Sequence, residues 1–268
     1  MTDLSIWLLG PFQVELFGEP VTSFSSDKVR ALLAYLAAEA DRPHRRDKLA
    51  GLLWSNSPQQ TARTNLRRAL ADLRKAIGDH QADPPYLLIT RQTIQFNGRS
   101  GAWIDTAVFT QLTAVKIMNE TVQRLEDAIA LYRGCFMEGF FLNDSLPFGE
   151  WALLQRERYQ RQALALLHSL ATHYEERGAY ERALNYAWQQ VELDPFQEPA
   201  QWQLIRLLAF TGQRVAALSQ YESFKQLLAK ELNVKPEVKT SHLRQQIQEK
   251  LLMTHIISSG LVENLHPR

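Results

Sequence analysis

The stretch TARTNLRRALADLRKAIG, residues 61–78, decides the interpretation of the N-terminal part of the chain. Its Leu66, Leu70, Leu73 and Ile77 recur at the spacing of one helical face, so the sequence predicts an amphipathic helix. Most of its other residues are Arg, Lys, Thr or Asn, which hydrogen-bond phosphates and base edges in DNA. The same polar face would suit a helix whose back is simply solvated, so the neighbouring segments must decide.

The ends of this helix are marked in the sequence. Ser57-Pro58-Gln59-Gln60 has the S-x-x-Q pattern of a capping box, with Pro at the first helical position. Gly78 supplies the C-terminal stop. We therefore expect one helix over residues 58–77, about 30 Å long.

The flanking segments predict the elements of a winged helix-turn-helix. Residues 1–24 alternate as strands, and an apolar face of helical period runs from Val29 to Ala37. A shorter helix follows Pro43. After residues 61–78, YLLITRQTIQFNG predicts a hairpin in which Ile89 faces Ile94 and Leu87 faces Phe96, if Arg91-Gln92 is the loop. Strands, three helices and a hairpin, in that order, are typical of this DNA-binding fold.

The polar face and the local charge favour nucleic acid as the ligand. Between Arg42 and Lys75 there are nine basic and two acidic residues, a local net charge of +7 in a chain of net charge +1. Arg45 and Arg46, which open the second helix, are candidate phosphate contacts. On a helical wheel the side opposite the leucines carries Thr61, Thr64, Arg68, Asp72 and Lys75, flanked by Asn65 and Arg67.

The C-terminal part predicts an all-α domain of tetratricopeptide-like repeats. Gly178, Ala183, Leu184 and Ala187 recur 34 residues later as Gly212, Ala217, Leu218 and Tyr221, which is the period of stacked helix pairs. The segment Asn97 to Gly101 predicts the boundary before it. We therefore expect a winged helix at 1–101, a helical domain at 102–255 and a tail or linker at 256–268, a mainly α chain.

The composition and the absence of known motifs argue against several other classes of protein. A chain of 268 residues with 45% hydrophobic residues and no long apolar run is expected to be cytoplasmic and to have no membrane span. The single cysteine, Cys135, excludes an intramolecular disulfide and is expected to be a buried thiol. No metal-binding, phosphate-binding or hydrolase motif occurs, so we expect no metal, no cofactor and no enzymatic activity.

These segments together resemble the bacterial antibiotic-regulatory activator family (SARP), in which an OmpR-type winged helix precedes a bacterial transcriptional activator domain. The resemblance covers roughly residues 4 to 250. It is carried by LLGPFQVELFGEPV, KVRALLAYLA, DKLAGLLW, ARTNLRRALADLRKAIG and WIDTAVF, and then by AIALYRGCFMEGF, EWALLQRERY and the stretch from ALNYAWQQVELDPF to LNVKPE.

The resemblance implies a transcriptional activator that binds double-stranded DNA as a homodimer on direct repeats near a promoter. It also implies contact with RNA polymerase or its sigma factor. In this sequence it implies base contacts from Thr64, Asn65, Arg68 and Asp72, phosphate contacts from Arg67 and Lys75, and a wing tip at Arg91 and Gln92.

Some alternatives stay open at this point. Asp72 stands where many OmpR-type helices are basic, and it can accept from a cytosine amino group or pair with Arg68; we favour the pair. The chain is either a short form or the N-terminal part of a longer regulator with a nucleotide-binding domain. The alternative function is a tetratricopeptide protein-interaction scaffold without specific DNA binding.

Overall fold

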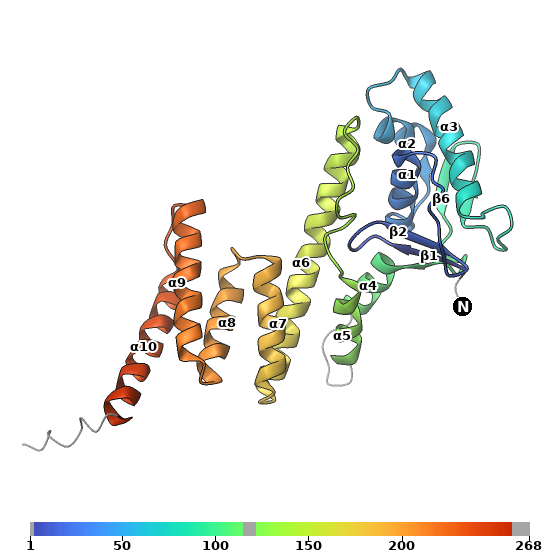
Figure 1. Ribbon diagram of the computed structural model, residues 1–268. Coiled ribbons are helices and arrows are strands. Elements are labelled where there is room, and N and C mark those ends of the chain that lie inside the picture. The colour runs from blue at the N-terminus through green and yellow to red at the C-terminus, as the bar shows by residue number, and fades with distance from the viewer. Residues whose placement is uncertain (1–2, 115–121, 259–268) are drawn as a thin grey trace, which may run out of the picture. The chain divides into compact units, whose positions relative to one another are not determined.

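The computed structural model describes residues 3–114 and 122–258, with side chains described up to residue 249 (Figure 1). The chain divides into two compact units, Met1–Gln162 and Ala163–Arg268. Within the described residues, no helix combines the length and the apolar character that crossing a membrane requires. The mainly helical fold with a small N-terminal sheet region confirms the predicted fold class.

The first unit begins with a four-stranded sheet whose strands are short. Alternation buries Leu4 and Ile6 on one face, as the sequence pattern predicts. The order in the sheet is β3-β2-β1-β7, and β1 and β7 are parallel. These strands are β1 (Leu4–Trp7), β2 (Gln13–Leu16), β3 (Glu19–Pro20) and β7 (Trp103–Ile104).

Three helices follow in the predicted order and pack on one another (Figure 1). Leu66, Leu70, Leu73 and Ile77 are each at most 5% exposed, so the leucine stripe is the buried face of the third helix. A residue in the left-handed conformation, Gly78, follows the end of that helix. The helices are α1 (Asp27–Ala38), α2 (Arg46–Leu53) and α3 (Gln59–Ala76).

The predicted capping box is wrong. The N-cap of α3 is Pro58, no side chain caps the helix, and the first helical residue is Gln59. The backbone carbonyl of Pro58 accepts the first hydrogen bond of the helix from the Ala62 N–H, at 2.9 Å. Since Pro58 occupies the N-cap rather than the first helical turn, Ser57 lies one residue too early to cap the helix.

The wing is a three-stranded sheet of order β4-β6-β5, made of β4 (His44–Arg45), β5 (Leu87–Ile89) and β6 (Thr93–Phe96). Leu87 faces Phe96 and Ile89 faces Ile94, which confirms the predicted register. The loop holds its shape without Gly or Asn because Thr90 Oγ1 accepts hydrogen bonds from the backbone N–H of Gln92 and Thr93.

The first unit also includes α4 (Asp105–Thr113), α5 (Val122–Leu131) and the first part of α6 (Leu146–Glu176). The compact unit extends well beyond residues 97–101, and the functional boundary placed there stays a prediction. The reason is that β7 pairs with β1, and residues 136 and 138 form bridges with residues 9 and 11. In this segment Cys135 is exposed, so the expectation of a buried thiol is wrong.

The second unit contains the end of α6 followed by α7 (Tyr180–Leu193), α8 (Glu198–Phe210), α9 (Arg214–Glu231) and α10 (Val238–Ser258). Successive helices from α7 to α10 contact each other (Figure 1). The predicted repeat is visible because Gly178 and Gly212 both have positive φ at helix ends, and Ala183 and Ala217 are fully buried in the following helices. Of the predicted tail at 256–268, residues 259–268 lie outside the described residues.

Candidate nucleic-acid interface

The polar side of α3 faces away from the core of the first unit. Arg67, Arg68 and Lys75 are exposed, and Thr61 is exposed in the first turn. Thr64 and Asn65 are half-buried. The Thr64 hydroxyl donates to the Gln60 carbonyl at 3.0 Å, so this side chain rests against its own helix.

Asp72 forms a hydrogen bond with a residue other than Arg68, the partner that we favoured. Its Oδ2 accepts a hydrogen bond of 2.7 Å from Oγ of Ser25, which precedes α1. Within the described residues no ion pair joins Arg68 to Asp72, so the expected helix-surface pair is not formed. The packing of α1 on α3 brings Ser25 within reach of the carboxylate, and the guanidinium of Arg68 stays exposed.

Arg45 and Arg46 have different environments although they are adjacent. Arg45 belongs to strand β4, where it pairs with Thr93, and it is exposed. Arg46 is the first residue of α2, and its Nε and Nη2 donate to the Thr90 carbonyl at 3.2 and 3.1 Å. Its backbone N–H donates to the Gln92 carbonyl at 3.0 Å. Arg46 therefore fixes the wing against the start of α2.

The start of α2, one side of α3 and the wing tip enclose a groove of about 850 Å³. The structure brings several predicted site residues together here, but six others lie elsewhere on α3, namely Thr61, Thr64, Asn65, Arg68, Asp72 and Lys75. Arg63 and Leu66 also line the groove, although neither was predicted as a site residue. The lining residues are Arg45, Arg46, Asp47, Arg63, Leu66, Arg67, Arg91 and Gln92.

Arg63 forms a two-pronged ion pair with Asp47 in this groove. Arg63 Nε lies 2.6 Å from Asp47 Oδ1, and Nη2 lies 2.9 Å from Oδ2. The hydrogen bond from Arg63 lowers the pKa of Asp47, and the same bond raises the pKa of Arg63. One signal in the sequence could have revealed Arg63: it lies four residues before Arg67, so both share a side of α3.

The groove is strongly basic. Its lining contains five arginines and one carboxylate. The pKa of Arg46 is lowered, first by burial and then by the nearby charge of Arg67. Guanidinium groups crowded in this way favour a polyanion, because each backbone phosphate offers two oxygens that accept two hydrogen bonds from one planar guanidinium.

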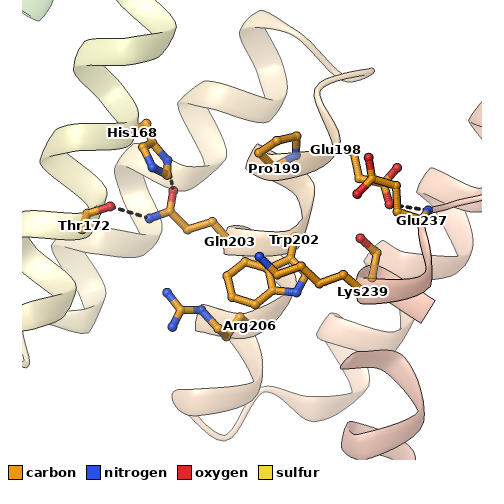
Figure 2. A pocket seen from close by; sticks show the side chains of 10 residues that line it. His168, Thr172, Glu198, Pro199, Trp202, Gln203, Arg206, Glu237 and Lys239 are labelled. Atoms are coloured by element: carbon orange, nitrogen blue, oxygen red, sulfur yellow. Dashed lines mark hydrogen bonds between the residues drawn. The ribbon is translucent and has the colours of Figure 1, made fainter. Parts of the chain in front are cut away.

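A second hollow, of about 400 Å³, lies in the helical unit among α6, α8 and the start of α10 (Figure 2). Its polar wall is held by Gln203, which is 2% exposed. Gln203 Nε2 donates to Thr172 Oγ1 at 3.2 Å, and Gln203 Oε1 lies 3.1 Å from both His168 Nδ1 and Gln190 Nε2. The Gln203 amide therefore joins three helices.

The charges around this hollow are mixed. The Trp202 ring lies 4.0 Å from Lys239 Nζ and 4.6 Å from Arg206 Cζ. Glu198 and Glu237 lie together on the right of the view, where Glu198 Oε1 accepts from the Glu237 backbone N–H at 2.7 Å (Figure 2). Arg206 and Lys239 are thus matched by two carboxylates here, whereas the lining of the basic groove has five arginines and one carboxylate. Within the described residues, no group of three or more His, Cys, Asp or Glu could hold a metal ion.

The comparison with protein families identifies the class of protein to which the chain belongs. The model of the bacterial transcriptional activator domain matches residues 104–248, which is more than half of the chain. The chain belongs to this family. The match begins at the end of β7 and extends into α10.

Individual relatives are regulatory proteins. The chain is 38% identical over 85 residues to the transcriptional regulatory protein EmbR of Mycobacterium tuberculosis, covering 32% of this chain and 22% of EmbR. It is 26% identical to the regulatory protein AfsR of Streptomyces coelicolor, covering 91% of this chain and 24% of AfsR. It is 23% identical to the transcriptional regulatory protein MoaR1 of Mycobacterium tuberculosis, covering 93% of this chain and 81% of MoaR1.

A solved structure shares the fold. The structure of Mycobacterium tuberculosis EmbR in complex with a low-affinity phosphopeptide aligns with a TM-score of 0.68 at 23% identity, covering 93% of this chain and 66% of that one. The family match and these relatives confirm the predicted SARP-type transcriptional regulator, and the relatives are regulators rather than enzymes. This chain spans less than a quarter of the length of EmbR and of AfsR in the sequence comparisons.

Proposed function

We propose that this chain is a sequence-specific DNA-binding transcriptional activator that reads DNA with α3. The observation that carries the proposal is the arrangement of α3, whose leucine face is buried while Arg68 is exposed and Arg67 lines a groove together with four other arginines. A scaffold protein whose α3 is merely solvated does not require a basic groove that includes the wing tip. An interface with the DNA backbone requires such a groove.

The residues divide into two proposed roles. Thr64, Asn65, Arg68 and Asp72 are proposed to face base edges in the major groove, with Thr61 on the same side of α3 and Asp72 restrained by Ser25. The remaining predicted residues are proposed to position the chain on phosphates and on the adjacent minor groove. These are Arg67 and Lys75 on α3, Arg45 and Arg46 at the start of α2, and Arg91 and Gln92 at the wing tip.

We further propose how the two parts of the chain share the work. Residues 1–101 supply DNA binding and residues 102–255 supply the activator function. The chain binds direct repeats near a promoter as a homodimer and contacts RNA polymerase or its sigma factor, in the cytoplasm where the DNA lies. The concentration of basic residues between Arg42 and Lys75 supports this division, because the rest of the chain lacks such a block.

A second candidate function is a tetratricopeptide-like interaction scaffold. The hollow among α6, α8 and α10 favours it, because a lining with the exposed His168 and Lys239 beside the half-buried Trp202 suits a peptide segment. This candidate does not account for the basic groove. Binding of a protein partner with no measurable binding to any DNA would favour the scaffold.

Fluorescence anisotropy of labelled duplexes tests the DNA proposal. The full chain is titrated against DNA from upstream of its own gene and against unrelated DNA, at two salt concentrations. Arg68→Ala is expected to weaken binding to the upstream DNA by about 1–3 kcal/mol. The control is Arg124→Ala, an exposed arginine on α5, which should leave the affinity unchanged. Equal losses in both variants would contradict a reading role for Arg68.

A further inference from the structure

The ion pair between Arg63 and Asp47 stands out among the groups of the basic groove. Asp47 is the single acidic side chain in the lining of this groove. Its two oxygens accept from Nε and Nη2 of Arg63 at 2.6 and 2.9 Å, so they occupy the edge of the guanidinium that suits a phosphate. The pair thus lies where the proposed function requires contact with the DNA backbone.

The pair is exposed and therefore easily exchanged. The side chains of Arg63 and Asp47 are 46% and 55% exposed. Exposed ion pairs are worth little, because water solvates both partners and salt screens them. A DNA phosphate offers Arg63 the same two-pronged geometry and also belongs to a polyanion whose binding releases counterions.

We infer that Asp47 is an intramolecular competitor for DNA: its carboxylate holds Arg63 in the free protein, and a backbone phosphate replaces it in the complex. This inference rests on the proposed function and adds Arg63 to the phosphate-contacting residues. After the exchange Asp47 is an unpaired negative charge beside the DNA backbone. Asp47 therefore lowers the affinity for every duplex by a similar factor, specific or not, because phosphates carry no sequence information.

Four forms of the full chain test this inference by anisotropy over a series of salt concentrations: wild type, Asp47→Asn, Arg63→Gln and the double variant. Asp47→Asn removes the competitor and is expected to tighten binding to specific and unrelated duplexes alike, roughly fivefold at low salt, with a steeper salt dependence. Adding Arg63→Gln to Asp47→Asn is expected to abolish that gain and to reduce the slope of log K against log salt by about 1.

The double variant separates two roles of Arg63. If Arg63 merely neutralises Asp47 and never meets a phosphate, Arg63→Gln changes nothing once Asp47 is already Asn. Equal affinities of Asp47→Asn and the double variant would therefore overturn the inference. So would an Asp47→Asn variant that binds no more tightly than wild type.

A matched ion pair serves as the control. Asp27 and Arg30 also form an exposed pair, and Asp27, like Asp47, lies in the first turn of its helix. Asp27→Asn and its double variant with Arg30→Gln remove the same charges outside the groove and are expected to change affinity less than twofold. Thermal melts of all variants check folding. A wild-type chain that binds no DNA would refute the proposed function itself, which is a different result from a binding chain indifferent to Asp47→Asn.

Discussion

Ser25 Oγ donates a 2.7 Å hydrogen bond to Asp72 Oδ2 and so links the segment before α1 to the exposed side of α3. The link joins residues 47 positions apart in the sequence. It removes Asp72 from the pair with Arg68 that we expected. The consequence for the interface is that Arg68 is not neutralised by its neighbour on the helix.

Separate and combined substitutions of Ser25 and Asp72 measure this link. Ser25→Ala and Asp72→Asn are each expected to lower the free energy of unfolding by about 1 kcal/mol, because each weakens a hydrogen bond to a charged group at the surface. The double variant should lose less than the sum, since both changes act on one bond. Urea unfolding followed by circular dichroism provides the measurement. Fully additive losses would show that the two side chains do not interact.

The stability of the first unit is predicted to depend on pH because of Asp105. Its carboxylate accepts from the backbone N–H of Leu8 and Leu9, each at 2.8 Å, and from Thr106 at 2.7 Å. Burial raises its pKa to about 6, against the lowering effect of these bonds and of Arg133. A pKa that is higher in the folded than in the unfolded state contributes stability below pH 4, which is lost as pH rises through 6.

The variant Asp105→Asn isolates this contribution because its side chain does not titrate. Between pH 4 and pH 7 the unfolding free energy of the wild type is expected to fall by about 2–3 kcal/mol relative to that of Asp105→Asn. Unfolding in urea at a series of pH values provides the comparison. A difference between the two proteins that is constant over this range, or that grows in favour of the wild type, would contradict the raised pKa.

Truncation before β7 is expected to destabilise the winged helix. A fragment of residues 1–101 loses the pairing of β7 with β1 and leaves the N–H groups of Leu8 and Leu9 without Asp105. Buried donors without partners cost about 1–3 kcal/mol each. A fragment of residues 1–162 keeps both features and should melt at a clearly higher temperature. Equal melting temperatures would show that these contacts contribute nothing.

The buried amide of Gln203 is expected to hold the second unit together. Gln203→Ala removes the partner of Gln190, His168 and Thr172, and we expect it to lower the unfolding free energy by about 2–4 kcal/mol. Gln226→Ala, at an exposed position of α9, is the matched control and should change it by less than about 0.5 kcal/mol. Calorimetry measures the melting temperatures of both variants, and similar values would contradict a structural role for Gln203.

Local periodicity was sufficient to predict several elements. The spacing of Leu66, Leu70 and Leu73 predicted the buried face of α3, and alternation predicted that Leu87 faces Phe96 in the wing. In both cases neighbouring residues determine the result. The 34-residue period likewise predicted the helix pairs, because each repeat buries the same positions against its neighbour.

Contacts between distant segments could not be predicted in this way. The pairing of β1 with β7 joins residues nearly one hundred positions apart, and no local pattern encodes the partner of a two-residue strand. The exposure of Cys135 and the hydrogen bond from Ser25 to Asp72 likewise depend on how distant segments pack. Arg63 could not be predicted as a site residue, because the groove that it lines is formed by three separate elements.

In vitro selection from a pool of random duplexes tests most directly the claim that this chain reads DNA sequence through α3. The full wild-type chain is expected to enrich a specific motif, repeated in tandem if the chain binds as a dimer on direct repeats. Arg68→Ala should lose preference at one position of the motif, while Arg124→Ala should enrich the wild-type motif. Retention of duplexes without any enriched motif, or an identical motif for Arg68→Ala, would contradict the account.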